Sequence, residues 1–509
     1  MSAYHHNSNS VIEQSKFNID WYDLFQMPGN DFEKYVKGLK RLVKDSWIKH
    51  NQPPVKTISD DEIVGQMKRL TDLDCTLDLQ IDELTQSRDC VVMKSPISAA
   101  NCFFPNMGKM KDIQTKQLTG YSLWDYFVEN ENPQTVFREI KRLIRCDGLY
   151  SYSQNILKAT PNSKGLETGE KWITDFNKNF DDNWVYWIQN FSGKSPRGQL
   201  NLNSKTFNRL LSKGLITEDQ CEGRDLSNID PDLPIRVKLY KKGQKIFPSG
   251  FNCFKQGIVK MGVNFPPSIS KTIYQHFTED LKHQDKIVIY DPSSGYGGRL
   301  LGALSLCGDR RIHYIGTDPN PDHYIEDLEI SRYDYMDRYY NSEIKRKHQT
   351  SVEVYQLGSE VVHREKGFKR YKGKIDFIFT SPPYFAAEGY SEDENQSFKK
   401  FPTYEEWRDG FLTQTLTTCV EYLKPGRWMC WNIADVSFGS KFYPLERDSV
   451  EIMKSLGMEY RHRWKMVLSG AVSNREISER TRVPSRKNYC SLRSSYRTYE
   501  PIFCFYKPE

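Results

Sequence analysis

Along the C-terminal half of the chain, short runs of apolar residues alternate with amphipathic stretches of helical spacing. Such alternation of strands and helices implies a parallel sheet with helices on both faces, that is, an α/β fold. The last two strands lack a helix-length connection, so we expect them to form an antiparallel hairpin at one edge of the sheet. The expected strands are 287–290, 312–317, 352–355, 375–380, 428–433 and a final pair that ends at 501–506.

The N-terminal half has a different pattern. Residues 1–16 are polar and predict a flexible tail. From 17 to 230 the pattern is mainly helical, because apolar residues recur at helical spacing in segments such as 31–47 and 133–144. This pattern predicts a mainly helical domain.

A second helical signal precedes the best candidate for a linker. Residues 204–220 predict two short helices around Gly214, either as an ordinary helix pair or as a DNA-reading helix-turn-helix. Residues 224–234 contain Asp and Pro between polar residues, which is typical of a linker. An α/β domain is therefore expected from 236 to 509.

Composition narrows the class of protein. With 509 residues, 38% of them hydrophobic, the chain is expected to fold into two or three domains. The 11 cysteines form no C-x-x-C pair and the 10 histidines show no ligand spacing, so we expect neither a metal site nor a disulfide framework. The N-terminus has no apolar signal core and no apolar run is long enough to span a bilayer, so we expect a cytoplasmic protein with no membrane partner. A net charge of +6 suits a nucleic-acid partner only if the basic residues cluster.

A glycine-rich turn follows the strand at 287–290. Gly295, Gly297 and Gly298 permit a tight turn and let backbone N–H groups approach a ligand. The next strand ends at Asp318, where a carboxylate can accept hydrogen bonds from ribose hydroxyls. The combination favours a nucleoside-containing cofactor over a purely structural turn.

The turn opens with Asp291 and Pro292, and an acidic residue there would repel a pyrophosphate. It would instead attract a cationic amino-acid group. S-adenosylmethionine carries both an ammonium and an adenosine, so it fits Asp291 and Asp318 together. Ser359 or Glu360, after the third strand, is expected to meet the adenine.

The strand at 375–380 ends abruptly in Ser381, Pro382, Pro383 and Tyr384. The alternatives are a rigid strand-ending turn and a socket for a planar ring that carries an NH2 group. In the socket, the ring stacks on Tyr384, and the amino hydrogens are accepted by Ser381 Oγ and the Pro382 carbonyl. Because a base stacked in a duplex cannot reach such a socket, base flipping would be needed.

Together these motifs resemble the S-adenosylmethionine-dependent amino-methyltransferases of DNA, whose Rossmann-like class I domain has a seven-stranded, mostly parallel sheet. The resemblance covers roughly residues 240–509. It implies S-adenosylmethionine as the cofactor and DNA as the partner, and it allows a cognate restriction enzyme as a companion. The matching positions are Asp291, Pro292, Gly295, Gly297 and Gly298 for the cofactor motif, Asp318 for the ribose, Phe265 for the segment over the methionine end, and Ser381, Pro382, Pro383 and Tyr384 for the catalytic motif.

Ser381 is typical of the cytosine-N4 branch of this family, so direct in-line transfer to cytosine N4 is the expected reaction. Adenine-N6 methylation is the first alternative. The others are an RNA guanine-N2 methyltransferase, a non-catalytic binding subunit of the same fold and, more remotely, a nicotinamide-dependent oxidoreductase.

Basic residues gather in 473–497, which predicts either a phosphate-contacting loop or a solvated edge loop. The N-terminal region is the candidate for DNA recognition, because no other segment leaves room for a recognition domain. The candidate phosphate contacts are Arg475, Arg480, Arg482, Arg486, Lys487 and Arg493.

Overall fold

The structure is a computed structural model with two compact units. One comprises residues from 57–122 and 261–509, and the other residues from 7–56 and 123–260. The structure describes residues 12–19, 27–50, 58–75, 79–112, 184–190, 200–202, 235–241, 263–385, 388–391, 393–438, 441–472 and 488–509, together with isolated positions between these ranges.

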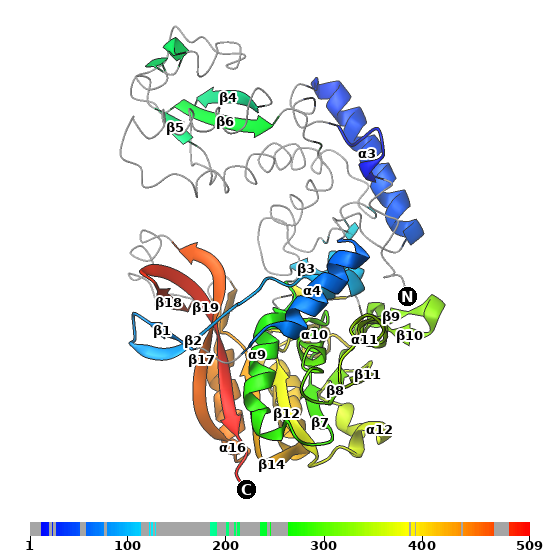
Figure 1. Cartoon of the computed structure of the whole chain (residues 1–509), viewed down its shortest axis with the longest axis vertical. Helices are drawn as coiled ribbons and strands as arrows, with labels where there is room; N and C mark the ends of the chain where they lie inside the picture. The colour runs from blue at the N-terminus through cyan, green and yellow to red at the C-terminus, as the bar shows by residue number, and fades with distance from the viewer. Residues whose placement is uncertain are drawn as a thin grey trace. The chain divides into compact units, whose positions relative to one another are not determined.

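A 10-stranded sheet forms the centre of the first unit (Figure 1). Its order is β1-β2-β17-β19-β14-β12-β7-β8-β11, with β18 paired to β19 beside this path. The strands from β11 to β14 run parallel, and β19 is antiparallel to both β14 and β17. The bounds are β1 Gln80–Asp82, β2 Ser87–Val92, β7 Ile287–Asp291, β8 Ile312–Thr317, β11 Ser351–Tyr355, β12 Ile375–Thr380, β14 Leu423–Asn432, β17 Glu459–Val472, β18 Tyr489–Leu492 and β19 Ser495–Tyr506.

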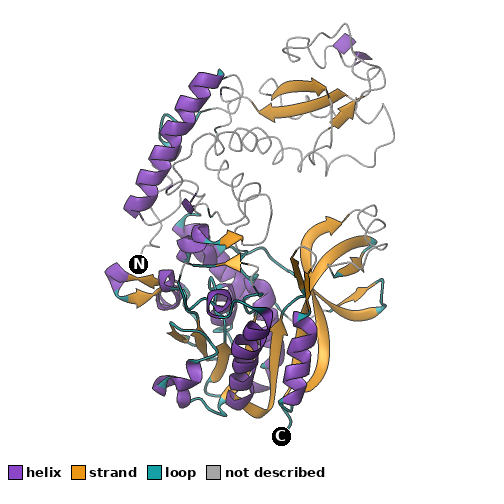
Figure 2. Cartoon of the chain, turned by 180° about the vertical axis from the view of Figure 1, so that it is seen from behind, coloured by secondary structure: helices purple, strands orange, loops and turns teal. Residues whose placement is uncertain are grey.

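Helices cover both faces of this sheet (Figure 2), which explains why its inner strands are almost wholly apolar. Along β7, Ile287 and Ile289 enter one apolar cluster, and Val288 and Tyr290 enter the other. The first cluster includes residues of α4 Asp60–Asp72, α9 Pro267–Phe277, α10 Gly298–Leu304 and α11 Arg332–Glu343, and the second includes residues of α12 Lys366–Lys369, α15 Thr413–Tyr422 and α16 Leu445–Ser455.

Short elements lie around the sheet. Two of them, β3 and β13, pair antiparallel with each other, as do β9 with β10 and β15 with β16. Their bounds are η1 Ala99–Phe103, η2 Pro105–Lys109, β3 Lys111–Asp112, η7 Glu279–Leu281, η8 Pro321–His323, β9 Tyr324–Ile325, η9 Glu326–Leu328, β10 Ile330–Ser331, η10 Val362–Arg364, β13 Glu388–Gly389, α13 Ser397–Lys400, α14 Tyr404–Glu406, η11 Trp407–Leu412, β15 Val436–Phe438 and β16 Lys441–Tyr443.

The α/β fold expected from the sequence is confirmed, and the expected strands correspond to β7, β8, β11, β12, β14, β17 and β19. One expectation was wrong: the antiparallel pair β17 and β19 is not at the edge of the sheet. The backbone groups on the outer side of β17 pair with β2, which runs parallel to it, and β1 follows beyond. The sheet therefore has three strands more than the seven expected: β1 and β2, which are N-terminal to the predicted domain, and β18, which lies within it.

The second unit contains α3 Gly29–His50, which includes the predicted helix at 31–47. It also contains an antiparallel sheet of order β4-β6-β5, formed by Trp184–Asn190, Ile235–Lys241 and Leu200–Leu202. Apolar and polar residues alternate through most of β6, which favours a strand over a helix, whereas β4 begins with five consecutive apolar residues.

Several predicted segments cannot be compared with the structure, because they lie outside the residues that it describes. The predicted helix at 133–144, most of 204–220 and the predicted linker at 224–234 lie outside the described residues. The predicted domain boundaries stay predictions. In the part of the chain that the structure describes, no helix combines the length and apolar character that crossing a bilayer requires.

Candidate functional site

The turn between β7 and α10 has a backbone that only glycine adopts readily. Gly295 and Gly297 have φ angles of +56° and +73°, in the left-handed region. A Cβ atom on Gly297 would lie 2.5 Å from Cε2 of Phe104, and one on Gly298 would collide with the carbonyl oxygen of Phe265. Gly295 is thus needed for the turn itself, Gly298 for the close approach of its neighbours, and Gly297 for both.

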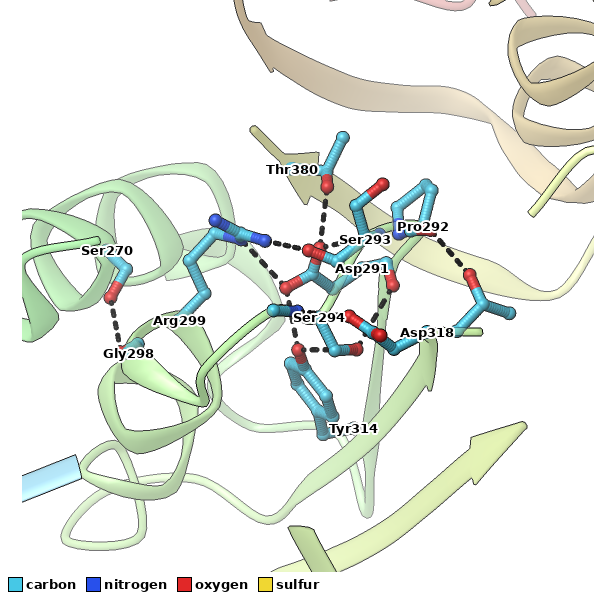
Figure 3. Close-up of polar contacts among 12 residues, drawn as sticks. Ser270, Asp291, Pro292, Ser293, Ser294, Gly298, Arg299, Tyr314, Asp318 and Thr380 are labelled. Atoms are coloured by element: carbon cyan, nitrogen blue, oxygen red, sulfur yellow. Dashed lines mark hydrogen bonds and ion pairs between the residues drawn. The ribbon is translucent and has the colours of Figure 1, made fainter. Parts of the chain in front are cut away.

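Asp291, the last residue of β7, holds this turn in place (Figure 3). One carboxylate oxygen accepts hydrogen bonds from Arg299 Nε at 2.8 Å and from the Tyr314 hydroxyl at 2.6 Å. The other accepts from the Thr380 hydroxyl at 2.7 Å and from the Ser293 N–H at 3.2 Å. Asp291 is 0% exposed, so its negative charge is directed entirely to protein groups.

The buried charges of this cluster compensate one another. Burial by itself lowers the pKa of Arg299, but the Asp291 carboxylate more than offsets it and raises that pKa above the ordinary value. Burial, and then Asp291, raise the pKa of Tyr314. Arg299 is therefore a permanent cation and Tyr314 a permanent donor toward Asp291.

Asp318 directly follows β8, and its side chain is 12% exposed. Its Oδ2 accepts from the Gly295 N–H at 2.9 Å and its Oδ1 from the Asn320 N–H at 3.0 Å. Nδ1 of His323 lies 3.3 Å from Oδ1. A carboxylate has about four acceptor positions, so Asp318 retains acceptor capacity for hydroxyl groups of a ligand.

Two further predicted residues lie close to this edge of the sheet. Glu360 follows β11 and is 5% exposed, and its Oε1 lies 2.8 Å from Nζ of Lys400. The ring of Phe265 packs against Phe379 of β12 at 5.3 Å between centroids, and the Arg299 guanidinium lies 5.5 Å from that ring. Phe265 therefore packs beside the Arg299 guanidinium, which in turn pairs with Asp291.

The Ser381-Pro382-Pro383-Tyr384 motif begins one residue after Thr380, the last residue of β12. Pro382 is buried and the other three residues are partly exposed. The Tyr384 hydroxyl donates a hydrogen bond of 3.3 Å to Oε2 of Glu500 on β19. Because Thr380 also bonds Asp291, the motif and the glycine turn lie at the same edge of the sheet.

An aromatic cluster anchors the end of the motif. Phe385 is 5% exposed, and its ring contacts Tyr404, Trp407 and Tyr443 at centroid distances of 5.5, 5.9 and 5.2 Å. Tyr404 donates to the Asp448 carboxylate at 2.6 Å. The backbone immediately after Tyr384 is thereby held by packing.

Most of the predicted DNA contacts lie outside the described residues: Arg475, Arg480, Arg482, Arg486 and Lys487. Arg493 is described. It is exposed in the two-residue turn between β18 and β19, where Arg493 and Ser494 have φ angles of 51° and 59°. Positive φ at both positions is typical of a hairpin turn that matches the twist of its strands.

Sequence reasoning missed Arg299, Tyr314 and Thr380, although each lies beside or within a predicted element. Arg299 and Thr380 flank the two motifs directly, so their position was a usable signal. Phe104 was missed for a different reason. It precedes the glycine turn by almost 200 residues, and no local pattern links the two.

Part of the chain matches the model of a known protein family. Residues 375–509, which begin with β12 and include the Ser-Pro-Pro-Tyr motif, match a family model described as DNA methylase, with N6 and N4 methyltransferases as its members. None of the curated proteins compared with the chain matches it.

Solved structures also match, at low identity. An S-adenosylmethionine-dependent O-methyltransferase from Thermotoga maritima is 11% identical over 55% of this chain and 77% of its own, with a TM-score of 0.27. A candidate DNA modification methylase from Thermus thermophilus, solved with S-adenosyl-L-methionine, is 18% identical over 27% of this chain and 49% of its own, with a TM-score of 0.18. This chain thus spans about half of that methylase. Because these TM-scores are low, we assign neither a fold nor a function from these two structures.

The similarity to a family therefore rests on the sequence match over residues 375–509, which include β12 and the Ser-Pro-Pro-Tyr motif. Residues 375–509 of this chain are thus similar to the N6/N4 family of DNA methylases, a family of S-adenosylmethionine-dependent methylases.

Proposed function

We propose that this protein transfers a methyl group from S-adenosylmethionine to the exocyclic N4 amino group of cytosine in DNA. The observation that carries the proposal is the hydrogen bond of 2.7 Å between Thr380 and Asp291. It joins the strand that ends in the catalytic motif to the strand that ends in the glycine turn. A cofactor on the turn and a base on the motif would therefore face each other at one edge of the sheet.

The residues at the turn fit S-adenosylmethionine. The bends at Gly295 and Gly297 allow a ligand close to the backbone, and Asp318 retains acceptor positions for ribose hydroxyls. Glu360 is proposed for the adenine, which requires its carboxylate to be shared with Lys400. Asp291 is already saturated by protein donors, so we assign it the role of fixing the turn instead of holding the ammonium group.

The catalytic motif supplies acceptors and a flat face. Ser381 Oγ and the carbonyl of Pro382 accept the two hydrogens of the amino group, which draws the nitrogen lone pair out of conjugation with the ring. Tyr384 stacks on the base, and its bond to Glu500 fixes the orientation of its ring. Because the prolines and the buried Phe385 leave little freedom, these groups are arranged before the substrate arrives.

The reaction is a direct substitution. When bound, S-adenosylmethionine supplies an electrophilic methyl group on a sulfonium. With S-adenosylhomocysteine as the leaving group, the methylated amino group would carry one proton too many, and the acceptors of the motif would pass this proton to solvent. A base in a duplex is stacked, so it must be flipped out to reach Ser381.

Transfer of a labelled methyl group to unmodified duplex DNA, followed by mass spectrometry of the nucleosides, tests the proposal. We expect N4-methylcytosine. N6-methyladenine would retain the geometry and overturn the assignment of the base, which rests on Ser381 as the first residue of the motif. If the label appeared on guanine in RNA and not on DNA, RNA would be the substrate. Cofactor binding without transfer to either nucleic acid would indicate a non-catalytic subunit.

A further inference from the structure

We propose that residues 99–112, here called the strap, are part of the cofactor site and connect it to the loop after the catalytic motif. The strap comprises η1, η2 and β3. It precedes the glycine turn by almost 200 residues and lies outside the segment that matches the family. The inference deepens the proposed function, because it rests on S-adenosylmethionine as the ligand of the turn.

Phe104 packs directly against the glycine turn. Its side chain is 0% exposed, and its ring leaves no room for a Cβ on Gly297. The same ring packs against His323 at 5.2 Å and Tyr333 at 5.0 Å between centroids. Phe104 thus fixes the turn against the Asp318 loop, which makes it a positioning residue.

A second contact reaches the other end of the turn. Oδ1 of Asn264 accepts a hydrogen bond from the Gly298 N–H at 3.0 Å. The Nδ2 group of Asn264 donates to Oδ1 of Asn101 in the strap at 3.0 Å. The first N–H of α10 is thus connected to the strap through one side chain.

The strap also reaches the loop that carries Asp318. Nζ of Lys109 lies 3.1 Å from Oδ1 of Asp322. The Asp322 N–H donates to Oδ1 of Asn320 at 3.0 Å, and the Asn320 N–H donates to Asp318 at 3.0 Å. Movement of Lys109 would therefore displace the proposed ribose carboxylate.

Buried polar atoms in this region indicate a ligand. Nε2 of His323 and both amide atoms of Asn106 have no hydrogen-bond partner among the described residues. The two residues are only 5% and 6% exposed. Leaving buried polar atoms unpaired is costly, so we infer that a bound ligand, or water held by it, satisfies them. Phe104 and Lys109, on either side of Asn106, both contact residues 322–323, which places Asn106 beside the Asp318 loop.

The strap then continues to the catalytic side. Lys111 and Asp112 of β3 pair with Gly389 and Glu388 of β13, a short distance beyond Tyr384. Two contacts support this pairing: the Tyr390 ring lies 6.1 Å from that of Tyr296 in the glycine turn, and its carbonyl accepts from Asn320 at 3.4 Å. Cofactor binding should consequently order the loop at 388–391, where the base would enter.

Asn106→Leu gives the sharpest test, because it keeps the number and branching of the side-chain heavy atoms and removes the unpaired amide. If the amide serves a ligand, the free protein should be at least as heat-stable as the wild type, while its affinity for S-adenosylmethionine by calorimetry falls by a factor of about 10. A purely structural role would instead lower the melting temperature and leave affinity unchanged, and that result would overturn the inference.

A charge swap tests the strap without touching the core. Lys109→Glu should weaken S-adenosylmethionine binding by a factor of about 3, and Asp322→Lys in the same chain should restore it. The matched control is Lys372→Glu, which breaks a pair with Glu421 at 2.9 Å at the start of β12, far along the strand from the catalytic motif. Equal affinities for all of these variants would refute the role of the strap. Failure of the wild type itself to bind would instead refute the proposed function.

Hydrogen exchange tests the connection to the loop. Adding S-adenosylmethionine to the wild-type protein should slow amide exchange both at 99–112 and at 388–391. If amide exchange slowed in the glycine turn alone, the strap would not connect cofactor binding to the loop at 388–391.

Discussion

The hydroxyl of Thr380 donates a hydrogen bond of 2.7 Å to the carboxylate of Asp291, across 89 positions of the sequence. Thr380 ends β12 and Asp291 ends β7, which are parallel neighbours in the sheet. The contact connects the residue before the Ser381-Pro382-Pro383-Tyr384 motif with the first residue of the glycine turn. We therefore expect a change in either residue to affect the position of the other.

Thr380→Val should uncouple the two motifs. The substitution keeps the shape of the side chain and removes one donor from a fully buried carboxylate, so we expect a loss of about 1–3 kcal/mol in the free energy of unfolding. Weaker cofactor binding should accompany it. Urea denaturation and calorimetry measure the two effects. The control is Thr272→Val, whose buried hydroxyl donates to the Ser268 carbonyl of its own helix and to no carboxylate among the described residues. Equal effects of both variants would contradict a special role for Thr380.

Arg299→Leu should be one of the most destabilising single changes in the α/β unit. It leaves the buried Asp291 carboxylate without its cation, which costs about 3–5 kcal/mol in typical buried pairs. Addition of Asp291→Asn should recover part of the loss in urea denaturation. Arg346→Leu is the comparison, because its partner Asp72 is 67% exposed and such pairs contribute about 1 kcal/mol or less.

Ser381→Ala should lower turnover by a factor on the order of 10² while leaving the affinity for S-adenosylmethionine unchanged, since it removes an acceptor used only at the reacting nitrogen. Methyl transfer at saturating cofactor measures the first effect and calorimetry the second. Ser455→Ala, at the end of α16, should leave both unchanged. Full activity of the Ser381 variant would remove this residue from the mechanism.

Asp318→Asn should weaken S-adenosylmethionine binding by a factor of about 10–100. The amide is neutral and presents a donor group next to the N–H groups of Gly295 and Asn320, so it accepts ribose hydroxyls poorly. Calorimetry measures the affinity. Asp285→Asn, an exposed carboxylate before β7, serves as the control. Unchanged affinity in both would place the ribose elsewhere.

His313 should make part of the stability dependent on pH. Its ring nitrogens lie 2.8 and 2.7 Å from the hydroxyls of Ser351 and Tyr371. Burial, together with nearby Lys286, lowers its pKa from 6.5 to about 4. The unfolded chain therefore binds more protons between these values. Stability is complete above about pH 6.5 and falls as the pH decreases toward about 4, by at most about 3 kcal/mol.

Two buried carboxyl groups change the free energy of unfolding in the opposite direction over the same pH range. Burial raises the pKa of Asp337 and of Asp435 to about 6, so their contribution decreases as the pH rises toward that value. Comparing wild type with His313→Gln isolates the histidine. The advantage of the wild type should shrink between pH 6.5 and 4, and a difference independent of pH would contradict the assignment.

The sequence by itself determined the parts of the site that are local in the chain. A buried strand consists of a run of apolar residues, and the first polar residue after the run marks the end of the strand. A turn with positive φ angles favours glycine. Hence β7, the glycine turn, Asp318 and the motif after β12 were placed correctly along the chain. The family resemblance rested on these motifs taken together.

The tertiary structure alone decided what these residues contact. Asp291 was expected to attract a cationic group of a ligand, and nothing in the sequence indicated that its carboxylate would accept hydrogen bonds from Arg299, Tyr314 and Thr380. Likewise, nothing in the sequence indicated that β2 would extend the sheet beside β17 or that Phe104 would lie against Gly297. Contacts between distant segments leave no periodicity and no local spacing, because they depend on how complete elements pack, and packing is fixed only when the whole sheet has formed.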